Sequence, residues 1–196
     1  MSEILGIDTI GLNYYYKKLE GGEDRKDDHS SIIYRMNREQ QQQLLLSLQS
    51  SAAEEATNYP YLVISERIDG ISSFNGLDIL VVKDFKKINN DNNLKMRIKK
   101  CKIGLEITLA DLRKNNGLYI AKQFNQIRYI YKFCKFNNCQ FILSSGASSI
   151  LEMVSGPSLD SILRICDIKP ANYWQELAEW IELRCRDKVN GVFINT

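Results

Sequence analysis

Short, largely apolar runs alternate with longer helical segments along this chain, and this alternation constrains its fold more than any other feature. YLVISE at 61–66, LDILVV at 77–82 and QFIL at 140–143 are runs of the kind found in strands buried on both faces. Between the last two lies 118–136, where apolar residues recur at spacings of three and four, as in an amphipathic helix. Repeated β–α units of this length predict an α/β domain built on a parallel sheet.

The remaining segments extend the same pattern. Further strands are expected at 6–16, 31–37, 103–109 and 189–196, and further helices at 38–57, 157–166 and 173–187. The connection 83–102 is expected to contain some helix, interrupted by a turn at the asparagines of 89–93. Pro157 suits the first turn of its helix, and Asn172 is predicted to cap the last helix. About seven parallel strands suit a TIM-barrel-like fold, incompletely closed, and a doubly wound open sheet is the alternative.

Size and composition favour one domain. The 196 residues are 44% apolar and 26% charged, which predicts a single globular domain over 1–196. No run approaches the ~18 apolar residues of a membrane span, and the N-terminus lacks the basic region and cleavage site of a signal peptide. The five cysteines include no CxxC pair, which favours reduced thiols. We therefore expect a cytoplasmic protein without a membrane partner.

The chain has a single histidine, His29, which lies in a polar stretch. A Ser-His-Asp or Cys-His site would depend on this one residue, and enzymes with several metal ions usually need several imidazoles. Glu66, Asp69 and Glu106 lie near predicted strand ends, but pairing with a local lysine or arginine is a more ordinary role for them than acid–base catalysis. The sequence thus predicts a protein that binds rather than catalyses, without a catalytic residue or a metal site.

The charged side chains are unevenly distributed. Residues 1–82 have a net charge of −6, residues 83–135 of +10 and residues 136–196 of −2. From 113 to 135 there are six basic side chains and no acidic one, with aromatic residues interleaved. Basic side chains neutralise phosphates, and aromatic faces stack on unpaired bases. This segment favours an anionic partner, and the alternative is a solvated, lysine-rich surface.

A second candidate site follows the predicted strand at 140–143, where the chain reads SSGASS. Ser144 and Ser145 offer hydroxyl groups, and the backbone around Gly146 offers N–H groups, at a point where a phosphate can dock. Small residues also serve tight turns between a strand and a helix, so a purely structural role is the alternative. The pattern is not the GxSxG of a nucleophile elbow.

These segments together resemble a known family. GLEITLADL is followed by the helix LYIAKQFNQIRYIYKFCKF and then by FILSSGASSILEMVSGPSLDSILRICDI, while TIGLNYYY, IIYRMN and YLVISERID stand upstream. In this arrangement the chain resembles, over about residues 6–187, the archaeal RNase P protein component 3 family, related to the 30-kDa protein subunit of eukaryotic RNase P. The SSGA element behind a basic helix is the most specific part of the resemblance.

The resemblance implies a TIM-barrel-like fold of the PHP-superfamily type and a role as a protein subunit of ribonuclease P, which removes 5′ leaders from precursor tRNA. In that family the RNA and its magnesium carry the chemistry, so no cofactor is expected in the protein. The implied partners are RNase P RNA, component 2, other RNase P protein subunits and, in the assembled complex, precursor tRNA. Arg128 and Lys132 match basic positions of the family. Together with the other candidate residues of the basic segment and the SSGASS element, the predicted RNA contacts are Arg113, Lys114, Lys122, Arg128, Lys132, Ser144 and Ser145.

The chain departs from the family's wider pattern in two ways. PHP enzymes carry a His-rich metal site that begins in the first strand, and this chain has no matching residues. Family members usually also have a strand and the start of a helix before the point that corresponds to Ile4–Ile10. Two alternatives stay open: a stand-alone metal-dependent phosphoesterase of PHP ancestry, and a structural subunit that touches only protein.

Overall fold

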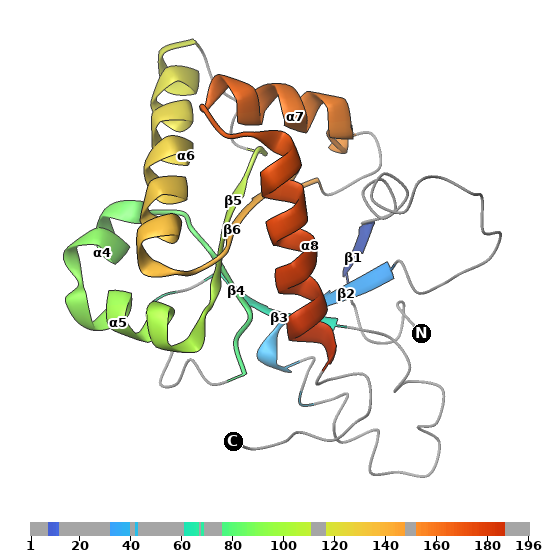
Figure 1. Cartoon of the computed structure of the whole chain (residues 1–196). Helices are drawn as coiled ribbons and strands as arrows, with labels where there is room; N and C mark the ends of the chain where they lie inside the picture. Colours follow the sequence, from blue (N-terminus) through green and yellow to red (C-terminus); the bar gives the residue numbers. More distant parts are fainter. Residues whose placement is uncertain are drawn as a thin grey trace, which may run out of the picture. The chain divides into compact units, whose positions relative to one another are not determined.

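A computed structural model describes residues 8–11, 32–39, 42, 61–66, 68, 76–110, 117–147 and 152–186 (Figure 1). The chain forms two compact units. Unit 1 comprises Met1–Ser65 and Glu179–Thr196, and unit 2 comprises Glu66–Ala178. The fold is of the α/β type, and all seven predicted RNA contacts belong to unit 2.

Unit 1 contains three short strands. β1 (Asp8–Gly11) pairs antiparallel with β2 (Ile32–Met36), and β2 pairs parallel with β3 (Tyr61–Ser65). The prediction of parallel strands throughout is therefore wrong for β1. Antiparallel neighbours do not need the crossover connection that parallel strands require, so a β–α alternation along the sequence does not fix the direction of every strand. A helical turn begins after β2, but most of the predicted helix 38–57 and the predicted strand 189–196 lie outside the described residues.

Unit 2 is built on a parallel sheet. β4 (Ile79–Val81) pairs with β5 (Gly104–Thr108), which pairs with β6 (Phe141–Ser144). All residues of β4 are buried, as are those of β5 and β6 before their last positions. The parallel sheet expected from the apolar runs is confirmed here. The described strands do not show closure into a barrel of about seven strands.

Two helices connect β4 to β5. α4 (Phe85–Asn90) and α5 (Asn92–Cys101) meet at Asp91, whose carboxylate accepts a hydrogen bond from the backbone N–H of Leu94 at 3.0 Å. Asp84 caps α4 in the same way, with 3.0 Å to the N–H of Lys86. The predicted turn within the asparagine-rich run is thus confirmed. It is centred on Asp91, which is the N-cap residue of α5.

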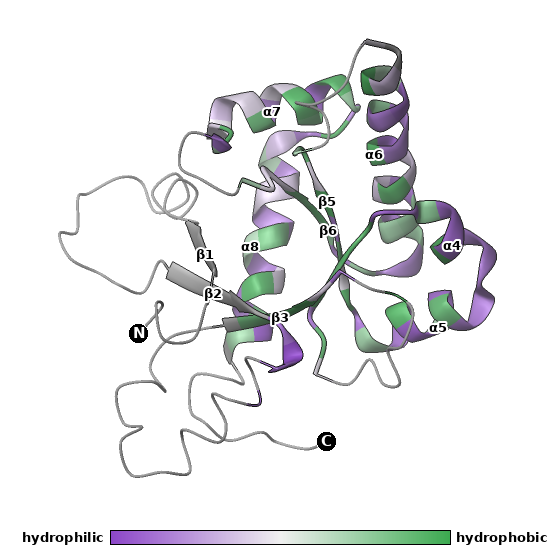
Figure 2. Cartoon of the chain, turned by 180° about the vertical axis from the view of Figure 1, so that it is seen from behind, coloured by the Kyte–Doolittle hydropathy of each residue, from purple (hydrophilic) through white to green (hydrophobic). Residues whose placement is uncertain are grey.

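α6 (Gly117–Asn137) follows β5 and matches the predicted helix. Ile127, Ile130 and Cys134 are buried on one side of it, while several lysines on the other side are exposed. Hydrophobic and hydrophilic residues accordingly alternate along its surface in Figure 2. The expected arrangement, apolar inward and basic outward, is confirmed.

Two further helices follow β6. α7 (Gly156–Ile165) has Pro157 in its first turn, as predicted, and Ser155 as its N-cap. α8 spans Pro170–Arg186, so the prediction that Asn172 caps this helix is wrong. Proline has a fixed φ and no N–H, which suits the first helical position, and the helix therefore starts three residues earlier than predicted.

The inner side of α8 is buried as expected and includes a residue that the sequence pattern missed. Tyr173 is fully buried, and its hydroxyl oxygen accepts a hydrogen bond from the backbone N–H of Leu143 on β6 at 2.8 Å. Burial raises the pKa of the Tyr173 phenol well above its ordinary value. Next to it, Trp174 Nε1 donates to the buried carboxylate of Asp160 on α7 at 2.7 Å. These two bonds join the first half of α8 to β6 and α7.

Candidate nucleic-acid interface

The structure places the predicted RNA contacts in two groups. Lys122, Arg128 and Lys132 project from α6, whereas Ser144 and Ser145 lie at the carboxyl end of β6. The predicted contacts at positions 113 and 114 lie outside the described residues. Helix α6 therefore carries all the basic residues among the predicted contacts that the structure describes.

Arg128 is a half-buried residue with protein partners. Its Nε donates to Asp167 Oδ2 at 3.2 Å, its Nη1 donates to Asn125 Oδ1 at 3.0 Å, and its Nη2 donates to the carbonyl oxygen of Ile165. Only 32% of the side chain is exposed. These bonds tie α6 to the segment between α7 and α8, so a phosphate at Arg128 would compete with the Asp167 carboxylate for the guanidinium.

The lysines of α6 differ in their surroundings. Lys135 forms an ion pair with Glu176 of α8, and its Nζ lies 5.6 Å from the centre of the Tyr131 ring. Burial acts to lower the pKa of Lys135, but the hydrogen bond to Glu176 and the charge of Tyr131 outweigh it, so the pKa is raised. Lys122 and Lys132 are exposed, and neither forms an ion pair with another residue of the described ranges.

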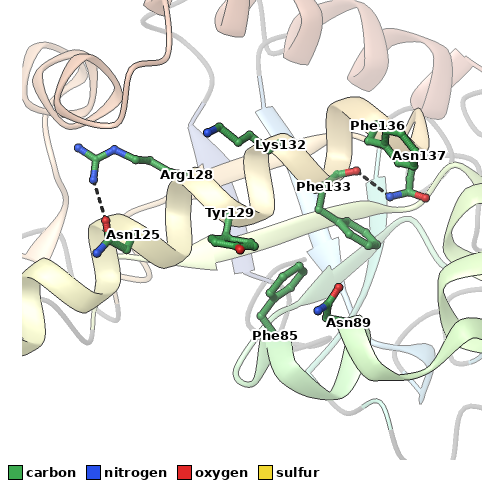
Figure 3. Close-up of a pocket in the computed structure, with 9 residues that line it drawn as sticks. All are labelled: Phe85, Asn89, Asn125, Arg128, Tyr129, Lys132, Phe133, Phe136 and Asn137. Carbon is green, nitrogen blue, oxygen red and sulfur yellow. Dashed lines mark hydrogen bonds between the residues drawn. The ribbon is translucent and has the colours of Figure 1, made fainter.

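An open groove runs along α6 beside α4. It has a volume of about 670 Å³ and is lined by Phe85, Asn89, Asn125, Arg128, Tyr129, Lys132, Phe133, Phe136 and Asn137. Phe85 and Phe133 point toward one another, while Arg128 and Lys132 extend away from Phe85 (Figure 3). The two phenyl rings meet edge to face, with centroids 5.3 Å apart and an interplanar angle of 83°. This pair holds α4 against α6 and fills the base of the groove.

The groove also presents exposed aromatic rings. Tyr129 is 69% exposed and Phe136 is 88% exposed. The aromatic residues of α6 stand out in the sequence, whereas no local signal links Phe85 and Asn89 to them, because these two residues belong to α4. Only the packing of α4 on α6 brings these residues beside Tyr129.

The two helices that line the groove, α4 and α6, and the helix α5 that follows α4 carry charge of one sign. Within their bounds, α4, α5 and α6 contain ten basic side chains and no acidic one. The nearest carboxylates in the described sequence around α4 and α5 are those of Asp84 and Asp91, which cap the two helices. A surface of this kind attracts anions over distances of about a Debye length, ~10 Å at 0.1 M salt.

The carboxyl end of β6 is a tight turn. Gly146 has a φ of +58°, and a Cβ atom at this position would lie 2.6 Å from Thr108 Cβ on β5. Ser145 Oγ accepts a hydrogen bond from the N–H of Ala147 at 3.3 Å, whereas the buried Oγ of Ser144 has no partner among the described residues. The Gly146 backbone therefore lies close to the side chains of Thr108 and Ala110 and leaves no room for a side chain of its own.

Of the carboxylates near strand ends, Glu66 forms an ion pair with Lys83 at 2.6 Å, as predicted for an ordinary structural role. Glu106 is buried on β5, and Asp69 lies outside the described residues. Within the described ranges, no three side chains of His, Cys, Asp or Glu are grouped so that they could hold a metal ion. Among the described helices, none combines the length and apolarity needed to span a membrane.

No protein-family model matches this sequence, and no curated protein matches it significantly. The family resemblance rests on sequence motifs that overlap β1, β2 and β3 upstream and β5, α6, β6 and α7 downstream.

Proposed function

We propose that this chain is an RNA-binding protein subunit of the ribonuclease P ribonucleoprotein, where it supports RNA-catalysed removal of the 5′ leader from precursor tRNA. The observation that carries the proposal is the basic surface of α4, α5 and α6, with ten basic side chains, no acidic one and exposed aromatic rings. The family resemblance supplies the identity of the complex. The implied partners are RNase P RNA, component 2 and the other protein subunits.

In this role the chain contributes charge and shape. Lys122 and Lys132 neutralise backbone phosphates and release counterions, which favours compact RNA. Arg128 positions α6 against the segment before α8. According to the family resemblance, hydrolysis belongs to the RNA and its magnesium, and the protein reduces the magnesium concentration that the folded RNA requires.

The proposal includes the fold that the resemblance implies, an incomplete TIM-like barrel of the PHP type. It is supported by β4, β5 and β6, which are consecutive parallel strands with helices between them. At the outer edge of β6, the N–H of Leu143 donates to Tyr173 and not to a further strand. An incomplete barrel is consistent with such an edge, because a closed one would use this N–H in a ladder.

Reconstitution tests the proposal. RNase P RNA and its other protein subunits are assembled with and without this chain, and precursor tRNA cleavage is measured across a magnesium titration. Omission should lower the cleavage rate at moderate magnesium or shift the titration to higher concentrations. An unchanged titration would overturn the proposal, and metal-dependent cleavage of phosphate esters by the chain alone would support the phosphoesterase alternative instead.

Charge reversal then tests the surface. The double variant K122E/K132E should shift the magnesium titration toward that of the complex lacking the chain, because two phosphate contacts become repulsive. Lys169→Glu is the control, since this lysine is exposed but lies between α7 and α8. Arg128 is left intact, because its replacement would also break the contacts to Asp167 and Ile165.

A further inference from the structure

We propose that the groove between α4 and α6 binds a single-stranded RNA segment, with bases stacked on Tyr129 and Phe136 and a phosphate beside Lys132. The inference rests on the proposed function for RNA as the partner. It goes beyond that function by naming the form of the RNA and the residues that hold it.

The spacing of the two exposed rings favours an unpaired strand. Tyr129 and Phe136 are seven residues apart on α6, so they share one face and are separated by about 10.5 Å along the axis. Successive bases of a duplex strand are about 3.4 Å apart, and their faces are covered by their neighbours. Rings at this spacing instead suit bases of an extended strand, whose faces are free to stack on aromatic side chains.

Two further aromatic rings of the groove lining, those of Phe85 and Phe133, contact one another. The edge-to-face contact of Phe85 with Phe133 places two apolar rings at the base of the groove without an RNA ligand. Asn89 of α4 is exposed at the same groove, and its amide can both donate to and accept from a base edge. Figure 3 shows this asparagine beside Phe85, across from the aromatic residues of α6.

Charge selects an anionic occupant over an apolar peptide. Arg128 and Lys135 have acidic partners, whereas Lys132 lines the groove without one in the described part of the chain. The two helices that line it, α4 and α6, contain no acidic residue within their bounds. A protein segment that buried the aromatic rings would leave this positive surface uncompensated unless the segment were itself acidic.

Fluorescence anisotropy with a labelled oligouridylate tests the inference, and an RNA hairpin of equal length serves as the duplex probe. Tyr129→Ala and Phe136→Ala should each weaken oligouridylate binding by about 5- to 100-fold, as expected for the loss of one stacked base. Tyr119→Ala is the matched control, because Tyr119 belongs to the same helix but does not line the groove. Lys132→Ala should reduce the slope of log affinity against log salt by about one. Thermal melts confirm that the variants fold.

The outcomes separate this inference from the proposed function. If Tyr129→Ala and Phe136→Ala bind oligouridylate like the wild type, or if the hairpin binds more tightly, the groove proposal is wrong even where the chain stimulates cleavage. If these variants keep RNA affinity but lose component 2, the groove is a protein interface and the proposal is also wrong. If the groove variants lose RNA affinity while omission of the chain leaves cleavage unchanged, the groove proposal stands and the RNase P assignment fails.

Discussion

Replacing Gly146 with alanine should destabilise unit 2 through two separate effects. The first is conformational, because the φ of +58° lies in the left-handed region that disfavours a side chain. The second is steric, because the new Cβ would lie 2.6 Å from Thr108 Cβ and 3.1 Å from Ala110 Cβ. Both neighbouring carbons are attached directly to backbone, so no flexible side chain can swing away to relieve the contact.

The magnitude follows from these two effects. A residue with a Cβ in the left-handed region costs roughly 1–2 kcal/mol, and overpacking a filled site costs about 1–3 kcal/mol. Gly146→Ala should therefore lower the free energy of unfolding by about 2–5 kcal/mol, a large part of the 5–15 kcal/mol typical of a domain. For a chain of this length, each kcal/mol shifts the melting temperature by about 2–4 °C.

Urea denaturation followed by circular dichroism measures the effect. The transition midpoint of Gly146→Ala should fall while the slope of free energy against urea stays unchanged. Gly117→Ala is the matched control, because no atom lies within 4 Å of its ideal Cβ and its φ is not in the left-handed region. That variant should be neutral or more stable by up to about 1 kcal/mol.

A midpoint for Gly146→Ala equal to that of the wild type would show that the site accepts a Cβ without cost, contrary to this prediction. A double-mutant cycle with Thr108→Gly identifies which effect dominates, because this change removes the closest contacting atoms and leaves the conformational strain. If the steric contact with Thr108 dominates, the double variant should lose less stability than the sum of the two single variants, whereas additive effects would indicate that this contact contributes little.

Three other changes test other parts of unit 2. Tyr173→Phe should lower the free energy of unfolding by about 1–3 kcal/mol, measured by urea denaturation, because the buried N–H of Leu143 loses its acceptor. Burial raises the pKa of Tyr173, so the stability linked to its protonation is fully present below the ordinary tyrosine pKa of about 10 and is lost as pH rises through the folded-state pKa. The variant should lack this loss of stability at high pH. Iodoacetamide should alkylate Cys139 before Cys134 in a mass-spectrometric time course. A hydrogen bond from Cys134 lowers the pKa of the Cys139 thiol, while burial raises the pKa of the Cys134 thiol. Equal alkylation rates would contradict this expectation. Arg128→Ala should lower stability in thermal melts by about 1 kcal/mol, because its partly exposed contacts join α6 to the segment before α8, whereas alanine at the exposed lysines of α6 should leave the melting temperature unchanged.

Much of the secondary structure of unit 2 could be predicted from the sequence, because burial on both faces leaves a continuous apolar run at each strand. The run at 77–82 contains β4, and α6 exceeds its predicted range 118–136 by one residue at each end. Where two local signals competed, the prediction was wrong: Asn172 is a good cap, but Pro170 suits the first helical position and starts α8 earlier. The antiparallel pairing of β1 was missed because strand direction is set by the path of the chain and not by residue type.

The order of residues is enough to show that α4, α5 and α6 are basic and that aromatic residues accompany those charges. Which of these side chains are available depends on how the helices pack. Arg128 and Lys135 form contacts with acidic residues 39 and 41 positions further along the chain, while Lys132 lies beside a groove to which α4 contributes Phe85 and α6 contributes Phe133. The free charge of a residue and the accessible face of its ring depend on its neighbours in space, and these neighbours come from distant parts of the chain.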